Sequence, residues 1–118
     1  MKTLFEKLGG RDAVNAAVDI FYKKVMADPS INHFFENVDM PRQVAKQKVF
    51  LTYAFGGAPN YSGKSMREAH KHLSLKEEHF NAVAGHLKAT LEELNVPEDL
   101  QNEVMAIAAS THDDVLNV

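Results

Sequence analysis

The chain has 118 residues, of which 45% are hydrophobic, and a formal net charge of -3 at pH 7. This length suits a single domain over residues 1–118 with a modest core. Because 13 basic residues are scattered among 16 acidic ones, no basic field favours nucleic acid or anionic lipid as a partner.

The absence of cysteine excludes disulfides, thiolate metal sites and a cysteine nucleophile. No run of about 18 apolar residues predicts a membrane span. The opening sequence has too little apolar length for a signal peptide, so we expect a cytoplasmic protein.

Capping-box patterns mark the expected helix starts. Each places a serine or threonine three residues before a glutamate, so that both side chains can satisfy free amides of the first turn. Pro97, followed by two acidic residues, suits a further first turn. The capping pairs are Thr3 with Glu6, Ser65 with Glu68, and Ser74 with Glu77.

Apolar residues recur at helical spacing in three segments, and no segment alternates as a strand does. Turn-forming residues separate these segments, notably Gly9-Gly10, Asp28-Pro29 and the stretch 56–63. The pattern predicts an all-α fold of about five or six helices. The stripes are Val14, Val18, Phe21 and Val25; Phe80, Val83, Leu87, Leu91 and Leu94; and Leu100, Val104, Ile107 and Val115.

The expected helix over 41–55 departs from a simple amphipathic pattern. One of its faces is mostly polar, and this face is either solvated or lines an internal cavity. Tyr22 raises the same question, because it lies beside Phe21 and Val18, where a buried phenol needs a hydrogen-bond partner or a ligand. The face consists of Gln43, Lys46, Gln47 and Phe50.

The motif MREAHKHL at 66–73 contains two histidines two residues apart. On a helix, His70 and His72 would point about 200° apart, so they cannot jointly bind one ion. Met66 and Leu73 lie on the side of His70, which predicts that His70 faces inward. A lone inward histidine is more often a core residue than a ligand. It does, however, suit the axial ligation of a metal that a planar macrocycle already holds.

Six motifs, taken in order, resemble the group I truncated haemoglobins. The resemblance covers nearly the whole chain, and the ordered set is far more specific than any one piece. It implies a two-over-two helical sandwich around haem b. The motifs are LFEKLGG at 4–10, AVDIFYKKV at 17–25, HFFENVDM at 33–40, FLTYAFGG at 50–57, MREAHKHL at 66–73 and DVLN at 114–117.

The resemblance assigns a role to each candidate site residue. It makes His70 the proximal iron ligand through Nε2 and leaves His72 on the surface. It places Tyr22, Gln43 and Gln47 on the distal side, where the phenol and amides would stabilise the partial negative charge of bound oxygen. The implied wall residues, each of which could equally be ordinary core, are Phe34, Phe35, Phe50, Met66, Phe80 and Leu116, with Phe35 packing on the haem face.

Two residues depart from the pattern of some relatives. Lys46 stands where several relatives have histidine as a sixth iron ligand, so it could pair with a haem propionate, remain solvated or coordinate the iron. Coordination requires the neutral amine of a group whose usual pKa is about 10.4. Some relatives bond a histidine covalently to haem, but counting back from DVLN puts Thr111, not His112, at that position. We therefore expect no covalent bond.

The resemblance implies a haem protein that binds O2, NO or CO, most simply as a monomer. Firm retention of oxygen favours nitric oxide dioxygenation to nitrate, with an external reductase because the chain has no flavin or nicotinamide domain of its own. An electron-transfer or peroxidase-like role is the alternative if Lys46 closes the sixth site. A haem-free helical interaction module is the third hypothesis.

Overall fold

The computed structural model describes residues 2–61, 68, 70–71 and 73–116, and the regular structure within them is entirely helical. This confirms the predicted all-α fold. No helix in the described part of the chain is long and apolar enough to cross a bilayer. The elements are α1 (Leu4–Leu8), α2 (Gly10–Met26), the 3-10 helix η1 (Asn32–Phe35), α3 (Met40–Ala54), α5 (Glu77–Glu93), α6 (Glu98–Ser110) and α7 (His112–Leu116).

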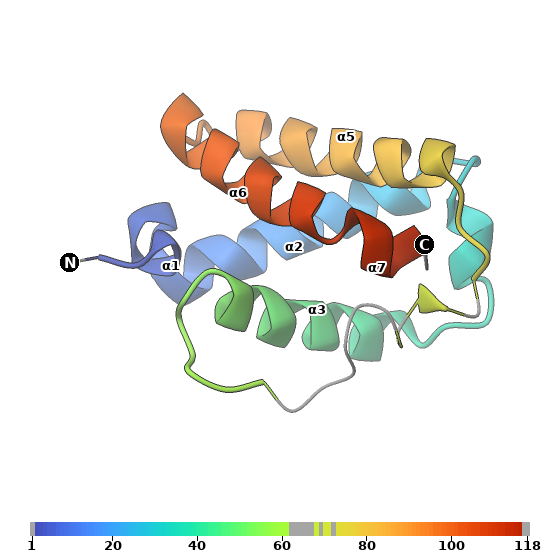
Figure 1. Cartoon of the computed structure of the whole chain (residues 1–118), viewed down its shortest axis with the longest axis horizontal. Helices are drawn as coiled ribbons and strands as arrows, with labels where there is room; N and C mark the ends of the chain where they lie inside the picture. Colours follow the sequence, from blue (N-terminus) through green and yellow to red (C-terminus); the bar gives the residue numbers. More distant parts are fainter. Residues whose placement is uncertain (1, 62–67, 69, 72, 117–118) are drawn as a thin grey trace.

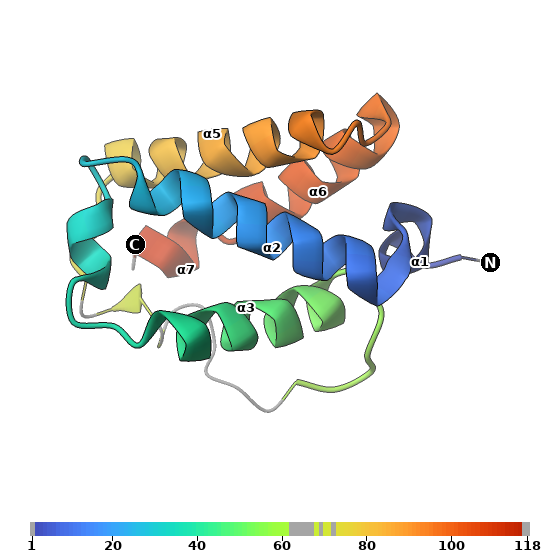
Figure 2. The same cartoon turned by 180° about the vertical axis from the view of Figure 1, so that it is seen from behind.

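The helices form two antiparallel pairs, α2 with α3 and α5 with α6 (Figures 1 and 2). Helix α2 also packs against α5, which joins the two pairs. At one end of the molecule α1 contacts both α2 and α6, and at the other end α7 contacts α5 and α6. This arrangement is the two-over-two sandwich that the resemblance implied.

The buried core follows the predicted stripes only in part. Val18 and Val25 of α2 and Val104 of α6 are each 1% exposed. In contrast, Val83 of the α5 stripe is 37% exposed. Helix α3 has no buried residue at all, although it contacts α2. The helices therefore meet tightly in some places and stand apart in others.

The predicted helix starts have different outcomes. Thr3 caps α1 as expected, because its Oγ1 accepts the backbone N–H of Glu6 at 3.2 Å. The start predicted at Ser74 is wrong. Ser74 has a φ of +52°, whereas a capping residue is extended, and α5 begins three residues later. There the backbone N–H of Lys76 donates to Nδ1 of His79 at 3.0 Å, so an imidazole supplies the acceptor.

The remaining two predicted starts are Ser65 and Pro97. Ser65 falls outside the described residues. Pro97 occupies the N-cap of α6, one residue before the helix begins at Glu98. Helix α3 has a cap that the sequence analysis did not single out, since Oδ1 of Asp39 accepts the N–H of Arg42 at 3.2 Å.

Candidate functional site

A large cavity lies between the two helix pairs. Its volume is about 1060 Å³, and most of its lining consists of aliphatic and aromatic side chains from α2, α3, α5, α6 and α7. Pockets for small molecules are commonly about 300–1,000 Å³. The cavity is therefore large enough to suggest a bulky, mostly apolar cofactor.

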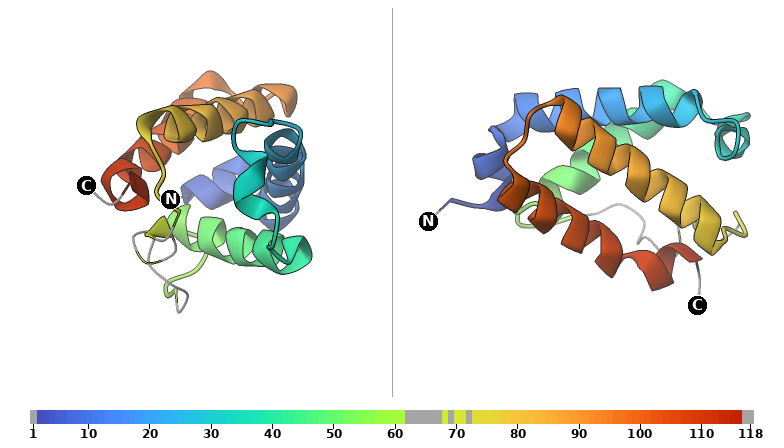
Figure 3. Two further views of the ribbon diagram at one scale, coloured as in Figure 1. Left: turned by 90° about the vertical axis from the view of Figure 1, so that its right-hand side faces the viewer. Right: turned by 90° about the horizontal axis from the view of Figure 1, so that it is seen from above.

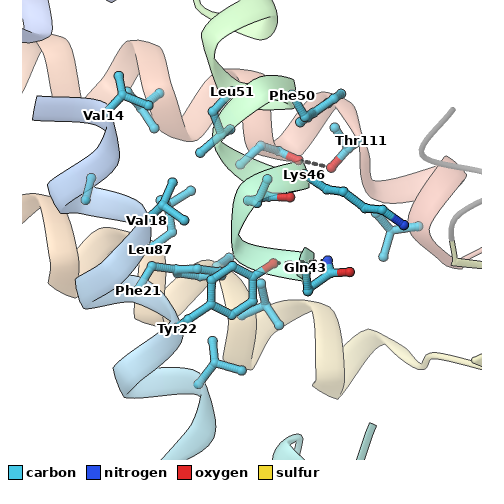
Figure 4. A pocket seen from close by; sticks show the side chains of 18 of the residues that line it. Val14, Val18, Phe21, Tyr22, Gln43, Lys46, Phe50, Leu51, Leu87 and Thr111 are labelled. Carbon is cyan, nitrogen blue, oxygen red and sulfur yellow. Dashed lines mark hydrogen bonds between the residues drawn. The ribbon is translucent and has the colours of Figure 1, made fainter. Parts of the chain in front are cut away.

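Tyr22 of α2 and Gln43 of α3 form the polar centre of this cavity (Figure 4). The Nε2 of Gln43 donates to the phenol oxygen of Tyr22 at 3.2 Å, and Tyr22 is 7% exposed. Phe21 and Phe35 pack edge-on against the Tyr22 ring, with centroids 5.2 Å and 6.0 Å away. Because Tyr22 accepts from Gln43, its own O–H remains available to donate to a ligand.

Burial raises the pKa of Tyr22 above its ordinary value of 10.0, and the hydrogen bond from Gln43 offsets part of that rise. The cause is desolvation, which disfavours the phenolate. Near neutral pH the side chain is therefore a protonated phenol. This is the form that can donate a hydrogen bond to a partly negative ligand.

Gln47 and Lys46 continue the polar face of α3 into the cavity. Both line it, with Gln47 half-buried and Lys46 exposed. Lys46 makes no hydrogen bond or ion pair with any residue in the described part of the chain. Figure 4 shows its side chain extending from α3 on the same side as Gln43. Of the two interpretations of this face, the structure favours a cavity wall.

Two imidazoles line the cavity among the described residues, those of His70 and His79. His79 uses its Nδ1 as an acceptor for a backbone N–H, so its neutral ring carries the proton on Nε2 and has no free lone pair for a metal. His70 is half-buried, and its carbonyl accepts the N–H of Leu73 at 3.0 Å. His70 is therefore the better candidate for an axial ligand.

The expected wall residues mostly reach the cavity. Leu116, however, is not among the described residues that line it, whereas Val115 is buried and does line it. Val115 already belongs to the third apolar stripe of the sequence, and the role of Leu116 as a wall residue stays a prediction. Met66 lies outside the described residues. The expected wall residues that do line the cavity are Phe34, Phe35, Phe50 and Phe80.

Sequence analysis missed Tyr61, Leu75 and His79 as lining residues. Tyr61 follows a stretch with no helical spacing, so no periodic signal could have placed it. His79 carried a weak signal, since it directly precedes the first residue of the α5 stripe. Loop conformations bring Tyr61 and Leu75 to the cavity, whereas His79 lies in the first turn of α5.

Thr111 and His112 differ in whether they reach the cavity, as expected from the count back from DVLN. Thr111 lines the cavity, whereas His112 does not belong to the lining. The His112 ring instead joins α7 to α5, with Nε2 2.6 Å from Oε2 of Glu77 and Nδ1 2.9 Å from Oδ1 of Asp113. Hydrogen bonds to Asp113 and Glu77 raise the pKa of His112. The expectation that no covalent bond to haem forms stays a prediction.

The cavity fits a haem by the chemistry of its lining. Its walls are mostly apolar, as a tetrapyrrole face requires, and one of them carries the imidazole of His70. The buried phenol of Tyr22, already held by an amide, offers one hydrogen-bond donor in an otherwise apolar space. These three features together match a cofactor with apolar faces, an axial position and a polar ligand.

Comparison with known proteins gives the same result. The chain matches the family model of the bacterial-like globins over residues 3–117. It is 58% identical to the group 1 truncated hemoglobin GlbN of Synechocystis sp., over 99% of both chains. It is 47% identical to the group 1 truncated hemoglobin of Tetrahymena pyriformis, over 98% of this chain and 95% of that protein.

Solved structures agree. The 2/2 hemoglobin from Synechococcus sp. PCC 7002, in the cyanomet state with covalently attached heme, has a TM-score of 0.96 to this chain. The two are 50% identical, and the match covers 99% of this chain and 100% of that one. The Fe(III) form of truncated hemoglobin from Tetrahymena pyriformis has a TM-score of 0.92 at 47% identity, over 98% of each chain.

Proposed function

We propose, because this chain belongs to the group 1 (group I) truncated haemoglobins, that its cavity holds haem b with His70 as the axial iron ligand. The family is one of haem-based gas-binding globins, and the apolar lining and the imidazole support the assignment in this chain. The wall residues would then pack on the two faces of the cofactor. We expect the loaded protein to be a monomer.

Bound haem supplies an iron that takes a diatomic gas such as O2, NO or CO. The residues around that position decide how firmly the gas is held. The O–H of Tyr22 donates to the partly negative gas, while Nε2 of Gln43 donates to the phenol oxygen. Each hydrogen bond polarises the other, which strengthens the donation from Tyr22. Gln47, one turn further along α3, adds a second amide to the same wall.

The activity that follows from firm oxygen retention is nitric oxide dioxygenation. In this reaction nitric oxide, O2 and one electron combine to nitrate. The electron would come from an external reductase. Tyr22 and the amides orient the oxygen molecule toward the entering nitric oxide, and the apolar walls keep water away from both.

A second candidate function rests on Lys46. Its side chain lines the cavity and has no hydrogen-bond or ion-pair partner within the described residues, so it is available to a sixth coordination position or to a propionate. If its neutral amine binds the iron, an electron-transfer role gains support over gas binding. Replacing Lys46 with Ala tests this, because a low-spin ferric absorption spectrum should become high-spin. An unchanged spectrum would remove Lys46 as an iron ligand.

The observation that carries the main proposal is the Gln43–Tyr22 hydrogen bond in an apolar cavity. The test is the oxygen dissociation rate of the haem-loaded Tyr22→Phe variant, measured by stopped flow. Loss of one hydrogen bond to a charged or partly charged group costs about 1.5–3 kcal/mol, which predicts a rate increase of roughly 10- to 150-fold. Nitrate yield on mixing the oxygen-loaded protein with nitric oxide should fall in the same variant.

Thr90→Val is the matched control. It also removes a buried hydroxyl, one that donates to the carbonyl of His86 at 2.8 Å, but Thr90 does not line the cavity. Its oxygen dissociation rate should equal that of the unchanged chain. A Tyr22→Phe rate no faster than that of the control would rule out Tyr22 as the oxygen-holding donor.

A further inference from the structure

Tyrosine is the side chain of this protein that most readily loses a single electron. The chain has three tyrosines, no tryptophan and no cysteine. Its methionines react with oxidants mainly by oxygen transfer to sulfur, which does not pass an electron onward. Tyr22 belongs to the gas-binding site described above. Tyr53 and Tyr61 have no part in that site's chemistry.

Tyr61 and Tyr53 form a continuous aromatic path from the cavity to the surface, which we call the tyrosine row. Tyr61 lines the cavity beside Phe50, with ring centroids 5.4 Å apart and planes at 74°. The Tyr61 ring also stacks on Tyr53, at 5.6 Å and 24°. Both separations lie within the range of aromatic contact, about 4.5–7 Å. Tyr53, on the outer side of α3, is 41% exposed and does not line the cavity.

Proton release distinguishes the row from Tyr22. A phenol that loses an electron also loses its proton, so an oxidisable tyrosine needs a group that accepts this proton. Tyr53 is open to water, which can accept the proton. Tyr22 is 7% exposed, and its described hydrogen-bond partner, Nε2 of Gln43, donates rather than accepts. We therefore expect the oxidising equivalent to pass from the cavity along the tyrosine row rather than to leave a radical on Tyr22.

We propose that Tyr61 and Tyr53 carry oxidising equivalents from the haem cavity to the surface, where Tyr53 oxidises phenolic reductants at the expense of hydrogen peroxide. The inference rests on the proposed function in one respect, namely that the cavity holds haem. Bound haem supplies the site at which peroxide is reduced. The reductant is a phenol in solution that reaches the exposed Tyr53 ring.

The overall reaction balances. One hydrogen peroxide takes two electrons and two protons to give two waters, and two donor phenols each lose one electron and one proton to become phenoxyl radicals. Tyr53 takes part twice per peroxide, losing an electron inward through Tyr61 and recovering one from a donor. Because a phenol gives up an electron far more readily than it accepts one, the row does not serve the external reductase.

The experiment adds hydrogen peroxide to the haem-loaded protein without a donor. We expect a tyrosyl radical by freeze-quench electron paramagnetic resonance, followed by dityrosine-linked dimers on a denaturing gel. Tyr53→Phe and Tyr61→Phe should each lose the dimers. Phenylalanine preserves the ring stack in both variants, so an unchanged Soret band shows that fold and haem binding persist.

A second readout separates the surface from the cavity. Phenol coupled to dextran is too large to enter the cavity, so its oxidation reports on the surface alone. The unchanged chain should oxidise it, and Tyr53→Phe should lose this oxidation. If both row variants form dimers and oxidise the dextran-bound phenol as fast as the unchanged chain, the tyrosine row is not the route and the proposal is overturned.

The outcomes also distinguish this inference from the proposed function. Absence of a Soret band after addition of haem would remove the proposed function and the tyrosine row together. A normal Soret band, faster oxygen release in Tyr22→Phe and undiminished dimers in Tyr53→Phe would remove the row alone. The three-tyrosine composition makes the radical assignment direct, because a variant that combines Tyr53→Phe with Tyr61→Phe keeps Tyr22 as its one tyrosine.

Discussion

The two halves of α5 carry one apolar stripe but meet different surroundings. In the second half Leu91 is 4% exposed, and a 2.9 Å ion pair between Lys24 and Glu93 ties this end to α2. In the first half Phe80 is half-buried, Val83 is 37% exposed, and both line the cavity. Figure 3 shows α5 crossing α2 near the end of α5 and diverging from it toward the start. The stripe thus reaches full burial in one half and stays partly open in the other, although residues of both halves line the cavity.

The largest expected effect compares two leucines one turn apart. Leu91→Ala removes a buried side chain and should cost about 2–5 kcal/mol of unfolding free energy in the haem-free protein. Leu87→Ala should cost clearly less, because Leu87 is half-buried, whereas Leu91 is 4% exposed. Urea denaturation of both variants measures the difference. In the haem-loaded protein the cost of Leu87→Ala should rise, since the side chain then packs on the cofactor.

Equal costs of Leu87→Ala and Leu91→Ala in the haem-free protein would contradict the difference in burial between the two halves of α5. So would a Leu87→Ala cost that does not respond to haem. The two leucines make a matched pair because they share a helix, a stripe and a side chain. They differ in burial, since Leu87 is half-buried and Leu91 is 4% exposed.

A smaller effect, of opposite sign, is expected where the two halves of α5 meet. Gly85 is exposed in the middle of this helix, and a Cβ added there would meet nothing within 4 Å. Gly85→Ala should stabilise the protein by about 1 kcal/mol through helix propensity, whether or not haem is bound. Gly57→Ala is the contrasting control, because its Cβ would lie 2.6 Å from the Phe5 ring. Thermal unfolding should give a higher Tm for the first variant and a lower Tm for the second.

The sequence allowed prediction of what depends on local spacing. The cap at Thr3, the all-α fold and the polar face of α3 all follow from residues three or four positions apart. The hydrogen bond that makes this polar face part of the site joins Gln43 to Tyr22, residues 21 positions apart on different helices. That pairing became predictable through family resemblance and not through periodicity.

Prediction from the sequence failed where loops or helix ends decide the outcome. Ser74 fits a capping pattern, but its left-handed backbone moves the start of α5 to Glu77. A break at Thr111 separates α6 from α7, and beyond it Val115 lines the cavity, whereas Leu116 is not among the lining residues. The contact between Tyr61 and Tyr53 depends on a loop with no repeat of its own. In each case the conformation of a loop or helix end decides the outcome, and the spacing of residues along the sequence does not predict it.

A further prediction concerns the tie between the middle of α5 and the turn after α2. Oδ2 of Asp28 lies 2.7 Å from Nε2 of His86, and Oδ1 of Asp28 accepts from both the hydroxyl and the backbone N–H of Ser30. The Ser30 hydroxyl, followed by His86, lowers the pKa of Asp28 from 3.8 to about 2. Because the folded pKa is depressed, the stabilisation is present above pH 3.8 and is lost as the pH falls toward 2.

Asp28→Asn should therefore lower the Tm near neutral pH, and the difference from the unchanged chain should close on acidification through that window. Thermal unfolding between pH 2 and 7 measures this difference in Tm. Ser30→Ala serves as the matched variant, because it removes one of the hydrogen bonds while leaving the charge. A Tm difference for Asp28→Asn that persists at pH 2 would show that the carboxylate charge is not the cause.

The smallest expected effect lies at the start of α5, where His112 joins α7 to Glu77. Hydrogen bonds to Asp113 and Glu77 raise the pKa of His112 above 6.5, so the folded state binds this proton more firmly than the unfolded chain does. The resulting stabilisation is fully present below pH 6.5 and is lost as the pH rises through the folded pKa, opposite in sense to that of Asp28.

His112→Gln should accordingly lower the Tm at pH 6 and have progressively less effect as the pH rises, by thermal unfolding of the haem-free protein. Glu77→Gln should reproduce this pH dependence, because it removes the carboxylate that holds the proton from the α5 side. A Tm difference for His112→Gln that grows with pH would reverse the sign and show that the neutral imidazole is the form that joins α7 to α5. The expected sense instead makes the start and the middle of one helix respond oppositely to pH, because the protonated His112 ties the start to α7 and the ionised Asp28 ties the middle to the turn after α2.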